Sequence, residues 1–358
     1  MKGQVRMKCL SSIVAVAGIV VAWGGRAESL SPDAMRALYD AVKTPFKFGV
    51  VLAPEKGHMV DNPCVFRQNG KWFMIYIDFD GKGYETRLAE SDDLLRWRPR
   101  GCVFHRGKPG DWDSAQADGW PLLLDPEWNG SNALRPFDGR YWMMYVGGAH
   151  EGYEADPLST GVAWTDDPSA AKEWTRHPHP VLGPDDADAR WFEKKTVYKH
   201  FVVEDPNRRL GARFVSYYNA KQNEPMTERI GVAVSDDLLH WRRVGKDPVI
   251  DDIGTARGIS GDPMIRRIGS TWVMFYFGFM WKPGVKGAFD TFAASKDLVS
   301  WTKWNGEPLV RTSESWDRQH AHKPWVLCVD GIVYHFYCAV GDGGRAIALA
   351  TSKPMKGR

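Results

Sequence analysis

The chain has 358 residues, of which 43% are hydrophobic and 25% charged, and its formal net charge is +3. This composition is that of a soluble globular protein and excludes a disordered chain, a collagen and a bundle of membrane helices. Its 45 aromatic residues (17 Trp, 12 Tyr and 16 Phe), with 36 Gly and 22 Pro, favour short strands and tight turns.

The first residues have the pattern of a secretory signal peptide. A basic start, MKGQVRMK, precedes an apolar run over 9–23 and small residues up to Ala27. The run is shorter than the roughly 20 apolar residues of a membrane-spanning helix, so we expect no stable membrane insertion after cleavage. Without residues 1–27 the sequence has 43 basic and 44 acidic residues, which removes the electrostatic case for nucleic-acid binding. We expect a periplasmic or secreted protein.

An N-terminal extension over 28–43 follows the signal. Residues 30–43, SLSPDAMRALYDAV, predict one short helix with Ser31 as its cap.

An aromatic-rich strand pattern then recurs five times, and this repeat determines the expected architecture. The copies are GKWFMIYI at 70–77, GRYWMMYV at 139–146, GARFVSYY at 211–218, STWVMFYF at 270–277 and GIVYHFYC at 331–338. A short apolar run precedes each copy: PCVF at 63–66, PLLL at 121–124, TVYKHFVV at 196–203, PMIRRI at 263–268 and PWVLCV at 324–329. A further strand and an Asp-rich turn follow, and four copies then have a tryptophan: Trp97, Trp174, Trp241 and Trp301. Recurrence at one repeat position indicates that these tryptophans pack between repeats.

Four antiparallel strands repeated five times, at spacings of 59 to 72 residues, are typical of a five-bladed β-propeller. The fifth copy stops after its third strand, so we expect the early strand FKFGVVL at 46–52 to complete that blade and close the ring. Two stacked β-sandwiches are disfavoured because no linker divides the sequence. The predicted fold is all-β, one five-bladed propeller of four-stranded antiparallel blades over 44–358.

Four cysteines lie outside the signal, and their even number permits disulfides without fixing their pairing. Cys328 and Cys338 flank a turn at Asp330-Gly331. The register of that hairpin would place Cys328 opposite about Val333, so we expect no bridge between Cys328 and Cys338.

The first strand of each blade lines the axis of a propeller, so the residues that enter these strands converge at one mouth of the channel. Every one of the five entrances carries an ionisable residue. A ring of carboxylates there suits glycosidic bond cleavage, in which one carboxylate activates water and a group of raised pKa protonates the leaving oxygen. Crowded like charges raise one of the pKa values. The two aromatic residues at the entrances, Trp120 and Trp191, offer flat faces for a sugar.

From about residue 44 to 354 the sequence resembles the five-bladed propeller glycoside hydrolases, the superfamily of families 32, 43, 62, 68, 117 and 130. The resemblance rests on Asp61 in VDNPCVFRQNGKWFMIYI and on the SDDLLRW and SDDLLHW turns. It implies that Asp61 of the first blade is the general base or nucleophile. The family 32 pattern WMNDPNG is absent, which disfavours a fructosidase.

The resemblance leaves two assignments of the general acid open. A family 43 pattern, with a third-blade Glu as acid and a second-blade Asp tuning it, maps onto Glu193 and Asp118. A family 117 pattern maps onto Asp262 of the fourth blade and His322 of the fifth. The predicted catalytic set is Asp61, Glu193, Asp262 and His322, with Glu193 as acid, Asp262 tuning it and His322 as the alternative acid. The expected substrate contacts are Asn62, Asp118, Trp120, Trp191, Lys194 and His320.

This chemistry requires no metal or cofactor. His320 and His322 alternate on an extended segment and could bind a metal with Asp262, but a channel histidine beside a solvent-facing one explains them better. Related propellers often hold a Ca²⁺ or a water in the axial channel, and the resemblance allows a structural Ca²⁺ here.

The sequence therefore predicts an exported glycosidase that acts on the ends of plant or algal oligosaccharides. One alternative is a phosphorylase similar to family 130, with phosphate at Lys194, Lys195, Arg257 and Lys323. The other is a non-catalytic sugar-binding propeller. An oligosaccharide is the expected partner, and no sequence feature specifies an oligomeric state.

Overall fold

The computed structural model describes residues 29–222, 224, 226–254 and 256–355. The predicted signal peptide over 1–27 lies outside the described residues. Within the described ranges the protein is nearly all strand, with one α-helix and one 3₁₀ turn, η1 (Ser315–Asp317). No helix in these ranges is long and apolar enough to cross a membrane.

Antiparallel pairing joins consecutive strands into groups of four. The first group is β2 (Met59–Gln68), β3 (Lys71–Phe79), β4 (Tyr84–Ser91) and β5 (Arg98–Phe104). The second is β6 (Gln116–Pro121), β7 (Tyr141–Gly148), β8 (Ser159–Thr165) and β9 (Thr175–Arg176). The third is β10 (Thr196–Glu204), β11 (Phe214–Lys221), β12 (Thr227–Ser235) and β13 (Arg242–Arg243), and the fourth is β14 (Gly258–Ile268), β15 (Thr271–Phe279), β16 (Phe289–Ser295) and β17 (Thr302–Lys303).

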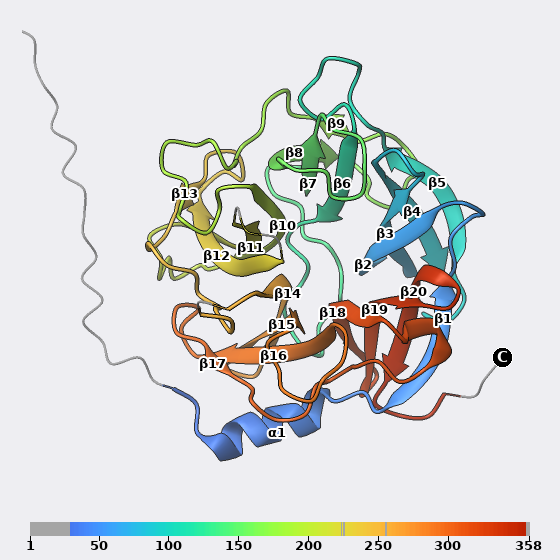
Figure 1. Ribbon diagram of the computed structural model, residues 1–358, viewed down its shortest axis with the longest axis vertical. Helices are drawn as coiled ribbons and strands as arrows, with labels where there is room; N and C mark the ends of the chain where they lie inside the picture. Colours follow the sequence, from blue (N-terminus) through green and yellow to red (C-terminus); the bar gives the residue numbers. More distant parts are fainter. Residues whose placement is uncertain (1–28, 223, 225, 255, 356–358) are drawn as a thin grey trace, which may run out of the picture.

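The last group contains strands from both ends of the described residues. β18 (His320–Val329), β19 (Ile332–Gly341) and β20 (Gly344–Thr351) form an antiparallel sheet, and β1 (Phe46–Leu52) pairs antiparallel with β20. The early strand thus joins the last three, as the sequence predicts. Short parallel contacts also link β4 to β6 and β12 to β14, so the described strands form three hydrogen-bonded sheets. Figure 1 shows the groups arranged around a common centre, with β2, β6, β10, β14 and β18 nearest to it.

The inner strand of the second group differs from the prediction. Of the apolar run at 121–124, Pro121 ends β6 and the other three residues follow it. Pro121 has no N–H group to continue the ladder, and Leu123 has a left-handed backbone with φ 58°.

Helix α1 (Pro32–Val42) lies within the segment predicted to be helical. The Ser31 side chain accepts a hydrogen bond from the Ala34 N–H at 3.2 Å and caps the first turn. Met35, Leu38 and Val42 are buried, so one face of the helix packs on the strand groups.

The recurring tryptophans contact neighbouring groups. The Trp97 ring packs edge-on against Phe336 of the last group at 5.8 Å between centroids. Trp301 packs in the same way on Tyr217 of the third group at 5.4 Å. These contacts confirm a packing role for both residues.

The Asp-rich turns cap backbone groups. In the first of them, Asp93 Oδ1 accepts hydrogen bonds from the Leu95 and Arg96 N–H groups, both at 2.9 Å. Cys328 lies opposite Val333 in the β18–β19 ladder, and Cys328 and Cys338 are both free thiols. The predicted register of this hairpin is confirmed.

Candidate active site

Four of the five inner strands carry the same irregularity near the axis. The ladders of β2, β10, β14 and β18 each shift register at one point, which marks a β-bulge. A non-glycine residue with φ between 52° and 63° occupies each bulge: Asn62, Lys199, Asp262 and Lys323. Left-handed backbone at four equivalent non-glycine positions stores strain, as is typical of functional sites.

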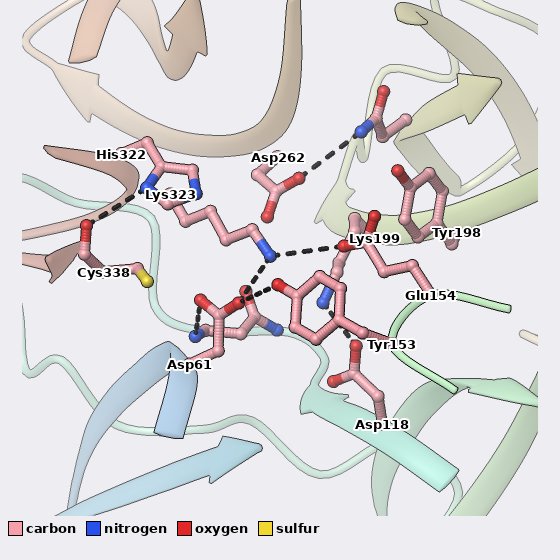
Figure 2. Close-up of polar contacts among 12 residues, drawn as sticks. Asp61, Asp118, Tyr153, Glu154, Tyr198, Lys199, Asp262, His322, Lys323 and Cys338 are labelled. Atoms are coloured by element: carbon pink, nitrogen blue, oxygen red, sulfur yellow. Dashed lines mark hydrogen bonds and ion pairs between the residues drawn. The ribbon is translucent and has the colours of Figure 1, made fainter. Parts of the chain in front are cut away.

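A pocket of about 200 Å³ opens above these bulges. Its walls combine aromatic rings with seven acidic or basic side chains: Glu154, Glu228, Asp262, His320, His322, Lys323 and Arg345. Grooves of about 640 and 760 Å³ beside α1 are larger, but their charged side chains belong to the outer surface. The small pocket at the centre is the one where buried titratable groups converge (Figure 2).

Asp61 does not line this pocket itself, but it accepts hydrogen bonds from three residues that do. Its Oδ2 accepts hydrogen bonds from Lys323 Nζ at 2.8 Å, Arg345 Nη1 at 2.8 Å and the Tyr153 hydroxyl at 3.0 Å. Its Oδ1 accepts one from the Asn62 N–H at 2.8 Å. Burial opposes ionisation, but the two cations outweigh it and hold the pKa of Asp61 well below its usual range.

Glu154 reaches the pocket from the loop over 149–158, between β7 and β8. Its backbone is left-handed, with φ 48°, and its N–H donates to the Tyr84 hydroxyl at 3.0 Å. The carboxylate lies 3.5 Å from Lys323 Nζ and 3.8 Å from Lys221 Nζ. Burial raises the pKa of Glu154, yet these two lysines reverse the effect and lower it below the ordinary value.

The pKa of Glu228, at the start of β12, is shifted in the opposite direction from that of Glu154. Its Oε2 accepts hydrogen bonds from the Tyr198 hydroxyl at 2.9 Å and from Asn219 Nδ2 at 2.8 Å. Burial raises the pKa of Glu228 to about 7, against the attraction of Lys221. One pocket therefore contains two glutamates, one with a lowered pKa and one with a raised pKa.

Asp262 is a third carboxyl group in the same pocket. Asn219 Nδ2, which also serves Glu228, lies 3.4 Å from its Oδ1, and its Oδ2 is buried without a partner among the described residues. Burial raises the pKa of Asp262 to about 6 although Lys323 and Lys199 oppose it.

The two predicted histidines line the pocket side by side, with ring centroids 5.6 Å apart. His322 Nδ1 lies 3.2 Å from the Cys338 carbonyl oxygen, which can only accept, so Nδ1 carries the proton. Burial, with Arg345 and Lys323 nearby, holds the pKa of His322 well below its usual range. A neutral His322 has no proton on Nε2 to donate, which argues against it as the general acid.

Asp118 lies on β6 beneath the pocket. It is buried and ion-paired with Lys199, whose ammonium group is itself only slightly exposed. Burial raises the pKa of Asp118 despite this lysine. Asn62 and Lys199 line a cavity of about 20 Å³ below.

The sequence places Glu193 at the axis as general acid, and the structure puts it elsewhere. Its carboxylate is fully buried, with Arg243 Nε and the Tyr218 hydroxyl each at 2.5 Å. Neither Glu193 nor these two partners lines the pocket. The carboxylate stabilises packing in the third group and is closed off from a substrate.

Of the six predicted substrate contacts, His320 alone lines the pocket; besides Asn62 and Asp118, three others lie outside it. Trp120 is buried and stacks on His200, so neither face is open to a sugar. Trp191 is 45% exposed, but its indole N–H donates to Asp247 and Arg229 covers its ring at 4.8 Å. Lys194 bonds the Ala189 carbonyl at 3.0 Å on the surface.

Sequence reasoning missed Tyr153, Glu154, Tyr198, Glu228 and Arg345. It considered only the starts of the inner strands. Because β3 runs antiparallel to β2, with Phe79 opposite Met59, the loop after each second strand reaches the same mouth. That loop has four residues in the first group (80–83) and ten in the second (149–158). The longer loop was a signal of function that could have identified Glu154.

The pocket contains few of the cations that a phosphate site would need. Of Lys194, Lys195, Arg257 and Lys323, only Lys323 lines it, and this lysine is bonded to Asp61. Within the described residues, the cluster with metal-ligand spacing is Glu85, Cys102 and His105, which lie on β4, on β5 and just after β5, outside the pocket.

Neither a protein-family model nor a curated protein matches the sequence. Two solved structures are 44% identical to it, one described as a complex of BT0996 with RGII and one as a glycoside hydrolase. In each, the match covers 92% of this protein and 97% of the other, with a TM-score of 0.87. A thermostable family-43 glycoside hydrolase is 14% identical over 84% of this protein and 95% of its own length, and shares the fold with a TM-score of 0.60.

Proposed function

Because the protein belongs to the propeller glycoside hydrolase superfamily, we propose that it hydrolyses the terminal sugar of an oligosaccharide with Glu154 and Glu228 as its catalytic pair. The observation that carries the assignment is that two carboxyl groups with different surroundings line one pocket. The Glu154 carboxylate lies within 4 Å of two lysine ammonium groups, whereas Glu228 accepts hydrogen bonds from a phenol and an amide. Glycoside hydrolysis needs one carboxyl group protonated and one ionised at the same pH.

Glu228 is the proposed general acid. A pKa of about 7 keeps its proton available at neutral pH, and the proton can pass to the leaving glycosidic oxygen. Asn219 and Tyr198 both donate to Oε2, which leaves Oε1 to carry that proton.

Glu154 is the proposed ionised partner. Lys323 and Lys221 keep it charged, so it can activate a water or attack the anomeric carbon. Asp61, the residue that the sequence favours for this role, has four donors around its two oxygens. We assign Asp61 as a positioning residue that holds Lys323, Arg345 and Tyr153 in place.

The other predicted members of the site keep supporting roles in this proposal. Asp262 shares the Asn219 amide with Glu228 and so helps to position that amide. His320 and neutral His322 would contact sugar hydroxyl groups from the opposite wall.

The size of the pocket supports action at the end of an oligosaccharide. A volume of about 200 Å³ is below the roughly 300–1,000 Å³ of pockets that hold drug-sized ligands, so it suits a single sugar ring. The relative described as a complex with RGII makes an RGII oligosaccharide the first substrate to try. A plant or algal oligosaccharide and export through the segment over 1–27 remain our proposals.

We also interpret the five strand groups as the blades of a closed propeller over 44–358. Antiparallel pairing of β1 with β20 supports completion of the last blade by the early strand. The ion pairs from Asp61 to Lys323 and Arg345 support contact between the first and last blades.

The test is turnover of RGII oligosaccharides and of arabinan, xylan, galactan and algal oligosaccharides, with products separated by chromatography. We expect one monosaccharide from one of these substrates and no dependence on phosphate.

Glu154→Gln and Glu228→Gln should each lower kcat by at least about 100-fold with the protein still folded. Glu193→Gln should lower Tm, because it breaks a buried ion pair, while the folded enzyme keeps its kcat. Wild-type activity in Glu228→Gln would refute the assignment.

A further inference from the structure

We propose that Lys199 and Lys323 occupy the place on the axis where a related propeller would hold a cation, so that this enzyme is built to work without an axial metal. Both lysines come from bulges on inner strands, and both side chains are about 5% exposed. The proposal concerns the ion pairs of Lys199 and Lys323 beneath the pocket, and it does not depend on which carboxyl group is the general acid.

The carboxylates on the axis are already neutralised by these ammonium groups. Lys199 of the third group bonds Asp118 of the second, and Lys323 of the fifth bonds Asp61 of the first. Figure 2 shows Lys323 between Asp61 and Glu154, with Lys199 directed at Asp118. Each lysine therefore joins two strand groups as well as two charges.

The remaining oxygen atoms do not suit Ca²⁺, which takes six to eight oxygen ligands. Both oxygens of Asp61 accept hydrogen bonds, and so does Oδ2 of Asp118. Three buried oxygens near the axis have no partner among the described residues: Asp118 Oδ1, Asn219 Oδ1 and Asp262 Oδ2.

The volume and the charge of the small cavity between the bulges also do not suit Ca²⁺. The cavity between the bulges is about 20 Å³, close to the size of one water molecule and too small for a hydrated cation. Its lining includes Lys199 and also His200, whose pKa burial lowers to about 3. Asn62 and Asp262 are the side chains of this lining that offer oxygen. A Ca²⁺ placed here would therefore meet an ammonium group and fewer side-chain oxygens than the six to eight it takes.

The bulge geometry explains why lysine reaches the axis at all. At a regular strand position alternate side chains face the two neighbouring sheets. The extra residue of a bulge redirects its side chain, here toward the axis, and two of the four bulges carry lysine.

The first experiment uses the wild-type protein and needs no substrate. After dialysis against EDTA, Tm should match that of the untreated protein, and added millimolar Ca²⁺ should not raise it. Elemental analysis should find less than one tenth of a metal ion per protein molecule. A Tm that falls on chelation, or a stoichiometric metal, would overturn the proposal.

The second experiment changes the lysine. Lys199→Met should lower Tm, and adding Asp118→Asn in the same protein should recover most of that loss, because the pair becomes neutral. Lys43→Met, which breaks an exposed pair with Asp40 on α1, is the matched control and should leave Tm unchanged. Rescue of Lys199→Met by Ca²⁺ instead of by Asp118→Asn would show that the axis accepts a metal and would contradict the proposal.

If none of the substrates is turned over, the Tm and metal measurements still decide whether the protein holds an axial metal. If turnover is found, the chelated enzyme should keep its full kcat.

Discussion

Glu154 and Glu228 share one small pocket and yet favour different protonation states. Two lysines lie within 4 Å of Glu154, whereas Glu228 receives hydrogen bonds from a phenol and an amide. Charge therefore decides the state of the first and burial that of the second.

The pH profile of kcat/KM should show this difference. Activity should fall as the pH rises through about 7, because Glu228 then loses the proton that it must donate. On the acid side it should fall only when Glu154, whose pKa is lowered, takes up a proton. Measurement of kcat/KM between pH 4 and 9 tests this, and an alkaline limb that stays in Glu228→Gln would point to another acid.

The same glutamate should reduce stability at high pH. The pKa of Glu228 is raised from 4.5 to about 7 on folding, so the folded protein binds its proton more tightly than the unfolded protein. Wild-type stability should therefore decline between those values relative to Glu228→Gln, by up to roughly 3 kcal/mol above pH 7. Thermal unfolding of both proteins at pH 4 and pH 8 measures the difference. Equal Tm differences at the two pH values would contradict the assigned pKa.

At the scale of single elements, the loop over 149–158 determines where Glu154 lies. Gln116 of β6 is fully buried and donates to the carbonyl oxygens of His150 at 2.8 Å and Gly152 at 2.9 Å. Tyr153 packs edge-on against Phe79. The second group thus anchors the loop at residues 150 and 152, just before Tyr153 contacts the first group.

Gln116→Leu should release this loop. We expect kcat to fall about 10- to 100-fold, since a carboxylate displaced by about 1 Å can lose that much activity, and KM to change less. Gln68→Leu is the matched control, because Gln68 bonds Tyr141 at 3.1 Å outside the pocket. Steady-state kinetics on both variants test the role of the loop. Equal losses in the two would show that Gln116 acts on stability alone.

At the scale of the whole molecule, Asp61 connects the first strand group to the last. Its carboxylate bonds Lys323 of β18 and Arg345 of β20, while Tyr153 reaches it from the second group. Within the last group, the main-chain pairing of β1 with β20 joins the two ends of the described chain.

Asp61→Ala should therefore reduce stability as well as activity. It leaves two cations buried without their partner, and breaking a buried pair in this way costs about 3–5 kcal/mol. Its pKa is lowered on folding, so the stabilisation is present at neutral pH and is lost as the pH falls through the acid range. Asp40→Ala on α1 removes an exposed carboxylate and should change Tm little. Urea unfolding of the two variants makes the comparison, and equal stabilities would argue against a role for Asp61 in closure.

The sequence alone determined the parts of this protein that depend on local chemistry. Alternating aromatic strands, Asp-rich turns, the Ser31 cap and the Cys328–Val333 register follow from residue patterns that recur or lie close together. The X-Pro steps at Asn62, Asp262 and Lys323 also mark three of the four bulges, because proline interrupts a ladder.

Only the tertiary structure decided which charged residues meet. Glu193 and Glu228 both belong to the third repeat, but Arg243 holds the first in a buried pair while the second faces the pocket. Glu154 lies on a loop whose path no repeat pattern specifies. Ionisation depends on burial and on charges from distant strands, such as the Lys323 that lies beside both Asp61 and Glu154, so it could be assigned only once the strands were placed around the axis.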